Sequence, residues 1–155
     1  MSKRGARILV VDDEIEIIRA LQRSLTVHGY EVFTASNGEE ALERIGYHRP
    51  DLVLLDLGLP GMSGLEAASY IVASGSRVLM FTMHESEHLA SEVSQAGAHG
   101  FVLKSQAGKD LIRAIERLLR GGTFFGSDSD PQENAPGPTF PAGKLTADSF
   151  LETWP

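Results

Sequence analysis

Five short apolar runs recur along the chain with helical patterns between them, and this rhythm limits the folds that the chain can adopt. The runs begin near residues 8, 31, 52, 78 and 100. A strand followed by a crossover helix is the βαβ unit, and right-handed crossovers favour an open parallel sheet with helices on both faces. Five units are too few to close a barrel. We therefore predict an α/β fold with a doubly wound, five-stranded parallel sheet.

Composition divides the chain into a domain at residues 1–122 and a tail at residues 123–155. Residues 121–155 contain five of the seven prolines and carry one basic and five acidic residues. Such a Pro/Gly-rich, acidic segment without a sustained period is typical of a flexible linker. Its end, residues 144–155, holds four large apolar side chains and is a candidate docking segment.

The overall charge and the termini exclude several classes of protein. The formal net charge is −7, so no global positive field favours direct binding to DNA or to an anionic membrane surface. The basic residues Lys3, Arg4 and Arg7 precede an apolar run too short for a signal peptide. No stretch is long and apolar enough to span a membrane, and the chain has no cysteine. We expect a cytoplasmic protein that does not bind membranes.

Polar side chains stand where four of the five apolar runs end. Asp12 and Asp13 follow the first run, Asp56 ends the third, Thr82 the fourth and Lys104 the fifth. An isolated Asp in this position often only starts a turn. Because parallel strands place their carboxyl ends along one edge of the sheet, we instead expect these five residues to converge on one site.

The chemistry of these side chains favours phosphoryl transfer. Three carboxylates repel one another unless a cation lies between them, and oxygen ligands suit a hard ion such as Mg²⁺. Asp56 can act as a nucleophile and form an acyl phosphate. A carboxylate is already ionised at neutral pH, so no histidine base is needed. Lys104 and Thr82 offer a positive charge and a hydroxyl to the transferred group.

From about residue 6 to residue 125 the chain resembles the receiver domain of bacterial two-component response regulators. The matching segments are Ile8-Leu9-Val10-Val11-Asp12-Asp13-Glu14, Leu55-Asp56-Leu57-Gly58-Leu59-Pro60-Gly61-Met62-Ser63-Gly64, Thr82, and Gly100-Phe101-Val102-Leu103-Lys104. The resemblance implies a flavodoxin-like, three-layer αβα fold with strand order 2-1-3-4-5. It also implies a signalling domain in a phosphorelay rather than an enzyme with an external substrate, one that catalyses only its own Mg²⁺-dependent phosphorylation and dephosphorylation.

The resemblance further implies a role for each site residue. Asp56 would accept a phosphoryl group from a sensor histidine kinase or a phosphotransfer protein. Asp13, Asp56 and the Gly58 carbonyl would bind Mg²⁺ directly, and Asp12 would act through water. Thr82 and Lys104 would contact the phosphoryl oxygens.

A conformational switch is implied as well. Thr82 would move toward the phosphoryl group, and the aromatic ring of Phe101 would then turn inward. This movement would alter the face formed by the fourth helix, the fifth strand and the fifth helix, which is also a candidate homodimer interface. A local change of charge would thus shift a population of conformers.

Two residues depart from the pattern of the family. Ser105 follows Lys104 where many members have a proline in a cis peptide; a cis bond before a non-proline residue costs about 2.5 to 4 kcal/mol, so we expect a trans bond and a different loop. Met83 stands where a small residue is usual, and its bulk is expected to narrow access to Asp56.

Three alternatives concern function and output. A phosphatase of the haloacid dehalogenase type also uses an Asp nucleophile with Mg²⁺, but it needs a second Asp where this chain has Gly58. A pseudo-receiver that only binds partners would not need the complete set of acids, threonine and lysine. Regulators with a Lys-Ser ending often continue into a helix-turn-helix module, for which residues 121–155 are too short and too acidic. We therefore expect either a stand-alone regulator or a shortened one.

Overall fold

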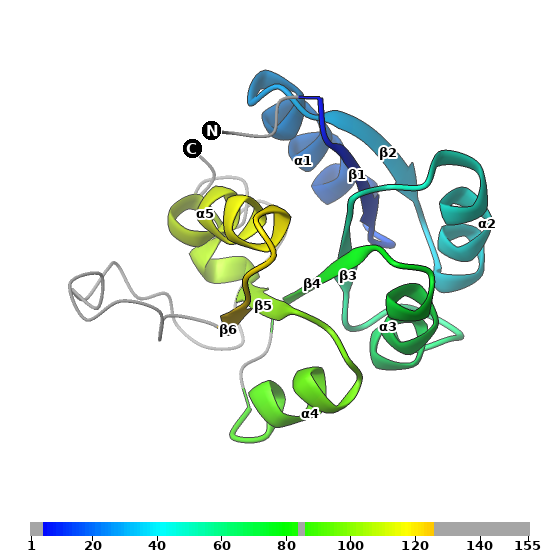
Figure 1. Cartoon of the computed structure of the whole chain (residues 1–155), viewed down its shortest axis with the longest axis vertical. Coiled ribbons are helices and arrows are strands. Elements are labelled where there is room, and N and C mark those ends of the chain that lie inside the picture. The colour runs from blue at the N-terminus through cyan, green and yellow to red at the C-terminus, as the bar shows by residue number, and fades with distance from the viewer. Residues whose placement is uncertain (1–4, 84–85, 126–155) are drawn as a thin grey trace.

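The computed structural model describes residues 5–83 and 86–125 and shows one sheet with helices on both faces (Figure 1). Its strands are all parallel, in the order β2-β1-β3-β4-β5-β6. The elements are β1 (Arg7–Val11), α1 (Ile15–Val27), β2 (Glu31–Ala35), α2 (Gly38–His48), β3 (Leu52–Asp56), α3 (Gly64–Ala73), β4 (Arg77–Thr82), α4 (Leu89–Gln95), β5 (Gly100–Leu103), the 3₁₀ turn η1 (Lys104–Gln106), α5 (Ala107–Leu119) and β6 (Phe124–Phe125). The predicted flavodoxin-like fold and its order 2-1-3-4-5 are confirmed, with one strand added at the end.

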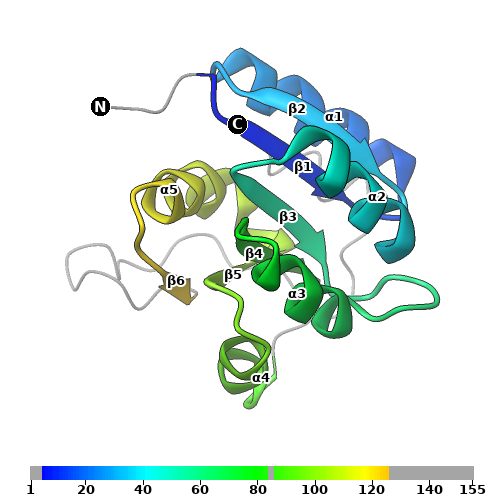
Figure 2. The same cartoon turned by 45° about the vertical axis from the view of Figure 1, so that its right-hand side comes forward.

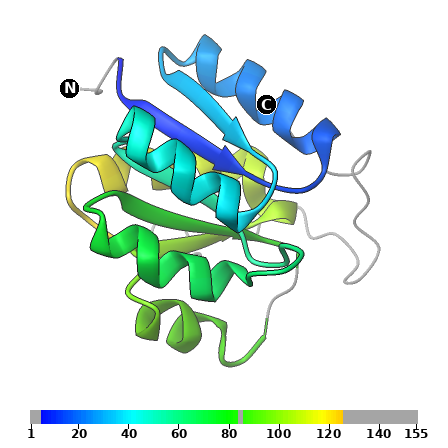
Figure 3. The ribbon, with the colours of Figure 1, turned by 90° about the vertical axis from the view of Figure 1, so that its right-hand side faces the viewer.

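Successive side chains of a strand point to opposite faces of the sheet. Both faces are covered here, which explains why the apolar runs are continuous. In β1, Ile8 and Val10 face one core cluster while Leu9 and Val11 face the other. The first cluster packs under α1 and α5, and the second under α2, α3 and α4. Figures 1 and 2 show these two helix layers on opposite sides of the sheet, and in Figure 3 the layer of α2, α3 and α4 faces the viewer. A strand that is covered on both faces has no polar side.

Local capping interactions fix where α2 and α3 begin. The side chain of Asn37 accepts a hydrogen bond from the Glu40 backbone N–H at the start of α2. Ser63 caps α3 in the same way through the Glu66 N–H at 3.1 Å. These caps set α2 and α3 beside the loops that follow β2 and β3.

The sixth strand corrects both the predicted number of strands and the start of the tail. Phe124–Phe125 pairs in parallel with β5, with Gly100 opposite Phe124 and Phe101 opposite Phe125. Phe124 is buried in the first core cluster, so the folded unit continues past residue 122. The prediction failed here because a two-residue strand has no period that could reveal it. The rest of the predicted tail, including residues 144–155, lies outside the described residues.

Strand β2 lies at the edge of the sheet and is only partly buried. Its first four residues are exposed or half-buried, unlike those of β3, which is buried throughout.

Within residues 5–83 and 86–125, none of the helices has the length and apolar character needed to cross a bilayer.

Candidate functional site

The polar residues at the strand ends meet at the carboxyl edge of the sheet, as predicted. Asp12 follows β1, Asp56 is the last residue of β3, Thr82 is the last of β4, and Lys104 begins η1 directly after β5. Strand β1 lies between β2 and β3, so the strand order reverses beside Asp12 and Asp56. Such a reversal leaves a crevice at the carboxyl ends of open α/β sheets, where ligands bind.

Three carboxylates form an acidic cluster at this crevice. Asp12, Asp13 and Asp56 can each present an oxygen within 4.8 Å of the others. Asp12 and Asp56 are buried, whereas Asp13 is exposed and opens the cluster to solvent. Hard oxygen donors at this spacing, with one side open to water, fit a cation such as Mg²⁺, which retains several waters when it binds protein.

Lys104 supplies the positive charge in the same site. Its Nζ lies 2.9 Å from Asp12 Oδ2 and 3.5 Å from Asp56 Oδ1, and the side chain is 2% exposed. The ammonium group also lies 5.5 Å from the centre of the Phe81 ring. Burial alone lowers the pKa of Lys104, but the charges of Asp12 and Asp56 outweigh it and hold that pKa above its ordinary value. Lys104 is therefore a fixed cation.

Asp56 is held in an environment that opposes its ionisation. Burial, together with the negative charges of Asp12 and Asp13, raises the pKa of the Asp56 carboxyl to about 6, although Lys104 and the Gly58 N–H act in the opposite direction. A carboxylate with so little solvation gains when positive charge is placed beside it. The site is thus suited to binding a cation, which would offset the negative charge of Asp56.

Backbone hydrogen bonds orient the two buried carboxylates. The Glu14 N–H donates to Asp12 Oδ1 at 2.9 Å, and the Gly58 N–H donates to Asp56 Oδ1 at 3.3 Å. Gly64, at the start of α3, allows a close approach behind the site, because a Cβ there would overlap the backbone of Asp56. Gly64 lies in one of the segments that match the family pattern, but no sequence pattern around it predicted this close approach.

The other predicted residues lie at the end of β4, on β5 and in the loop that follows β3. Thr82 is buried at the end of β4, and Met83 follows it, half-buried. Gly58 is exposed, and a Cβ on it would meet nothing within 4 Å, so the loop leaves space on that side. Phe101 is buried on β5, where its ring lies edge-on to that of Phe125, with centroids 6.3 Å apart.

Ser105 has the predicted backbone. The peptide bond between Lys104 and Ser105 is trans, and the chain runs through η1 directly into α5. Lys104 is therefore held at the junction of a strand and a helical turn.

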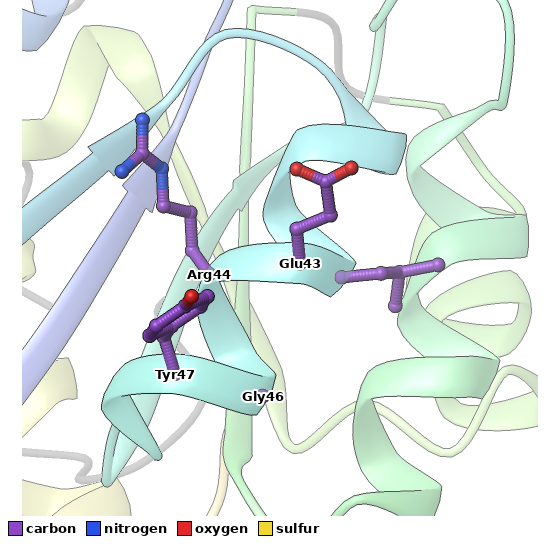
Figure 4. A pocket seen from close by; sticks show the side chains of 5 residues that line it. Glu43, Arg44, Gly46 and Tyr47 are labelled. Carbon is purple, nitrogen blue, oxygen red and sulfur yellow. The ribbon is translucent and has the colours of Figure 1, made fainter.

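A separate hollow of about 620 Å³ lies on α2 and contains none of the predicted site residues (Figure 4). It is lined by Leu42, Glu43, Arg44, Gly46 and Tyr47. All of these residues belong to α2, whereas the acidic cluster lies at the carboxyl edge of the sheet. The hollow is therefore not part of the acidic site.

The chain is thus a doubly wound α/β protein. Its acidic cluster and Lys104 lie at the carboxyl ends of β1 and β3, where the strand order reverses. The model of the response regulator receiver domain matches residues 8–116. The chain belongs to this family, and it is the receiver domain of a two-component signalling protein.

Individual relatives agree with this assignment. The transcriptional regulatory protein KdpE of Mycobacterium tuberculosis is 37% identical over 122 residues, covering 75% of this chain and 52% of KdpE. A LuxR-family two-component response regulator from Aurantimonas superposes with a TM-score of 0.74 at 36% identity, covering 78% of this chain and 89% of that one. The beryllofluoride-activated receiver domain of Klebsiella pneumoniae RstA gives 0.70 at 27% identity, covering 74% and 98%. The chain spans about half the length of the curated relatives it matches.

Proposed function

We propose that Asp56 accepts a phosphoryl group from the phosphohistidine of a sensor histidine kinase or a phosphotransfer protein. One observation carries this proposal: the buried Asp56 carboxylate lies within 4.8 Å of oxygens of Asp12 and Asp13, and 3.5 Å from Lys104 Nζ, which also pairs with Asp12 at 2.9 Å. A nucleophile beside a cation-binding cluster and a fixed ammonium is the arrangement that phosphoryl transfer needs.

The transfer step uses only the carboxylate as nucleophile. With a pKa of about 6, Asp56 is mostly ionised at neutral pH and needs no general base. One Asp56 oxygen forms a bond to phosphorus while the bond between phosphorus and the histidine nitrogen breaks, and the imidazole keeps the electron pair and takes a proton from solvent. Lys104 and Thr82 then contact oxygens of the new acyl phosphate.

The acidic cluster is proposed to hold Mg²⁺ through Asp13, Asp56 and the Gly58 carbonyl, with Asp12 acting through water. When bound, Mg²⁺ supplies positive charge that offsets the charge on the phosphoryl oxygens. Asp13 is exposed and Asp12 is paired with Lys104 at 2.9 Å, which supports a direct role for the first and an indirect role for the second.

Switching is proposed to run from Thr82 to Phe101. Thr82 ends β4, and β4 pairs with β5, which carries Phe101. A shift of Thr82 toward the phosphoryl group makes room for the Phe101 ring and alters the face formed by α4, β5 and α5. That face is the proposed contact for a downstream protein or for a second copy of the chain.

We propose that the protein is a cytoplasmic signalling module rather than an enzyme with a separate substrate. Its catalysis is limited to its own phosphorylation and dephosphorylation. The acidic net charge of −7 argues against direct DNA binding by this chain and against membrane binding. A dehalogenase-type phosphatase is disfavoured because Gly58 stands where its second Asp is required.

Beryllofluoride, a phosphoryl analogue, provides the test. Isothermal titration calorimetry with Mg²⁺ and beryllofluoride is expected to show binding to the wild type and to Asp51→Asn, and none to Asp56→Asn. Asp51 is a matched control because it is an exposed carboxylate beside the opposite end of β3. A wild type that does not bind, or an Asp56→Asn variant that binds equally well, would contradict the proposal and leave the pseudo-receiver as the better account.

A further inference from the structure

The loop between β3 and α3, residues 57–63, carries the one proposed direct metal ligand that is not a carboxylate, the Gly58 carbonyl. Figure 2 shows this loop projecting beyond the carboxyl end of β3. We propose that Leu59 and Met62 are positioning residues: their side chains hold the loop, and with it the Gly58 carbonyl, in one place and so give the site a preference for Mg²⁺ over Ca²⁺. This inference rests on the proposed function and adds the residues that set the metal selectivity of the site.

Hydrogen bonds close the base of the loop. The Leu57 N–H donates to the Phe81 carbonyl at 3.3 Å, and the Gly64 N–H donates to the Leu57 carbonyl at 3.1 Å. Between these ends, the Gly58 N–H donates to Asp56 Oδ1 at 3.3 Å, which is longer than most N–H···O bonds. The backbone therefore fixes the ends of the loop more firmly than it fixes Gly58.

Leu59 anchors the loop beside the proposed ligand. Its side chain is 7% exposed and belongs to the second core cluster, whereas its neighbours Gly58 and Pro60 are exposed. Moving Leu59 out of the core would return its apolar surface to water, which is unfavourable. The burial of Leu59 thus restrains the residue that directly precedes it.

Met62 anchors the loop a second time, on the first turn of α2. A Cβ on Gly38 would lie 3.3 Å from both Cβ and Sδ of Met62, so Met62 packs where Gly38 has no side chain. Gly38 is buried, and Asn37 caps this turn of the helix. The flexible thioether of methionine suits such an irregular space. The surface on which Met62 rests is therefore itself well fixed.

The tip of the loop has open space beside it. Gly61, with a φ of 75°, turns the chain there in a conformation that favours glycine. A hollow of about 250 Å³ lies between the tip and the start of α2, lined by Asn37, Gly38, Glu39, Pro60, Gly61 and Met62. Because the tip is not packed continuously, the loop depends on its two anchored side chains.

The preference between the two ions follows from their coordination chemistry. Mg²⁺ requires a nearly ideal octahedron with ligands at about 2.0–2.1 Å, whereas Ca²⁺ accepts about six to eight oxygens at about 2.3–2.6 Å in flexible arrangements. A carbonyl ligand that moves by a fraction of an ångström therefore disfavours Mg²⁺ more than Ca²⁺. The carboxylates of Asp13 and Asp56 suit either ion. Loosening the loop should thus weaken the binding of Mg²⁺ selectively.

Titrations of the ¹⁵N-labelled full chain with Mg²⁺ and, separately, with Ca²⁺ measure both affinities by NMR. Leu59→Ala and Met62→Ala are each expected to lower the Mg²⁺ affinity about tenfold and the Ca²⁺ affinity by less than about twofold. Gly38→Ala is expected to act in the same direction, by about threefold for Mg²⁺, because its methyl group shifts Met62 by a few tenths of an ångström. Met62→Leu keeps a large apolar side chain and is expected to bind like the wild type.

Val72→Ala is the matched control. Val72 is half-buried and packs against the same core cluster as Met62, but it lies near the last residue of α3, at the end of the helix away from the loop. Its truncation is expected to lower the free energy of unfolding in urea, as Met62→Ala does, and to leave both metal affinities unchanged.

A second measurement needs no metal. In the presence of a chelator, the ¹⁵N relaxation order parameter of the Gly58 amide is expected to fall in Met62→Ala and to keep its wild-type value in Val72→Ala. A side chain that contributed only to overall stability would not change the local mobility of Gly58 in the folded protein.

The outcomes separate this inference from the proposed metal site. If the wild type binds Mg²⁺ but Leu59→Ala and Met62→Ala retain its affinities for both ions, the positioning role is refuted while the site stands. Equal losses for the two ions, or a wild type that binds Ca²⁺ as tightly as Mg²⁺, would also refute it. If the wild type binds no Mg²⁺, the proposed metal site fails together with this inference.

Discussion

Replacing Asp56 with asparagine should stabilise the fold while it removes the phosphoacceptor. The pKa of Asp56 rises from the ordinary value of 3.8 to about 6 on folding. Each pKa unit corresponds to about 1.4 kcal/mol, so keeping Asp56 ionised in the folded protein costs about 3 kcal/mol. Asparagine has nearly the same shape without the charge and avoids this cost. In the presence of a chelator, Asp56→Asn should therefore be about 3 kcal/mol more stable at neutral pH.

The raised pKa of Asp56 also determines how the free energy of unfolding changes with pH. Between 3.8 and about 6 the folded protein retains a proton on Asp56 that the unfolded chain has lost. The stability that this proton provides is fully present at low pH and is lost as the pH rises through about 6. The difference in the free energy of unfolding between Asp56→Asn and wild type should thus be small near pH 3.8 and reach its full size above about pH 6.

Urea unfolding across this range measures the difference, with Asp51→Asn as a control for a carboxylate that is exposed. Adding Mg²⁺ should stabilise the wild type and have a much smaller effect on Asp56→Asn, because the ion offsets the same charge. An Asp56→Asn variant that is no more stable than wild type at neutral pH in chelator would refute the reasoning about burial.

Three further substitutions test other parts of the site. Met83→Ala should speed labelling by acetyl phosphate severalfold, because it widens access to Asp56; equal labelling rates in the two proteins would refute this. Gly64→Ala should lower the free energy of unfolding by about 1–3 kcal/mol in urea, since its Cβ overlaps the Asp56 backbone, and an unchanged midpoint would contradict the close approach. Lys104→Met should cost about 3–5 kcal/mol at neutral pH by leaving Asp12 and Asp56 without their buried cation; a neutral effect in the same assay would show that the pairing contributes little.

The fold followed from the sequence because its central strands are buried on both faces. Runs such as residues 52–55 are short, continuous and apolar, a pattern typical of a parallel strand that is covered on both faces. The position of the site followed for a related reason. Parallel strands end at one edge of the sheet, and β1 and β3 are neighbours in it. Asp12 and Asp56 therefore meet, although 43 residues lie between them in the sequence.

Other features depend on contacts that no local pattern encodes. Strand β6 forms because Gly100 leaves space for Phe124, and this pair is far apart in sequence. The raised pKa of Asp56 depends on burial, which the three-dimensional packing determines. Lys104 lies nearer to Asp12 than to Asp56, a preference that the order of residues along the chain does not reveal.

The claim that Asp56 is the phosphoacceptor can be tested most directly by locating the phosphoryl group. The protein is incubated with Mg²⁺ and acetyl phosphate, the acyl phosphate is trapped by reduction with borohydride, and the modified residue is identified by peptide mass spectrometry. The account predicts a single modification at Asp56 that requires Mg²⁺ and is absent from Asp56→Asn. Modification of a different residue, or none in the wild type, would contradict it.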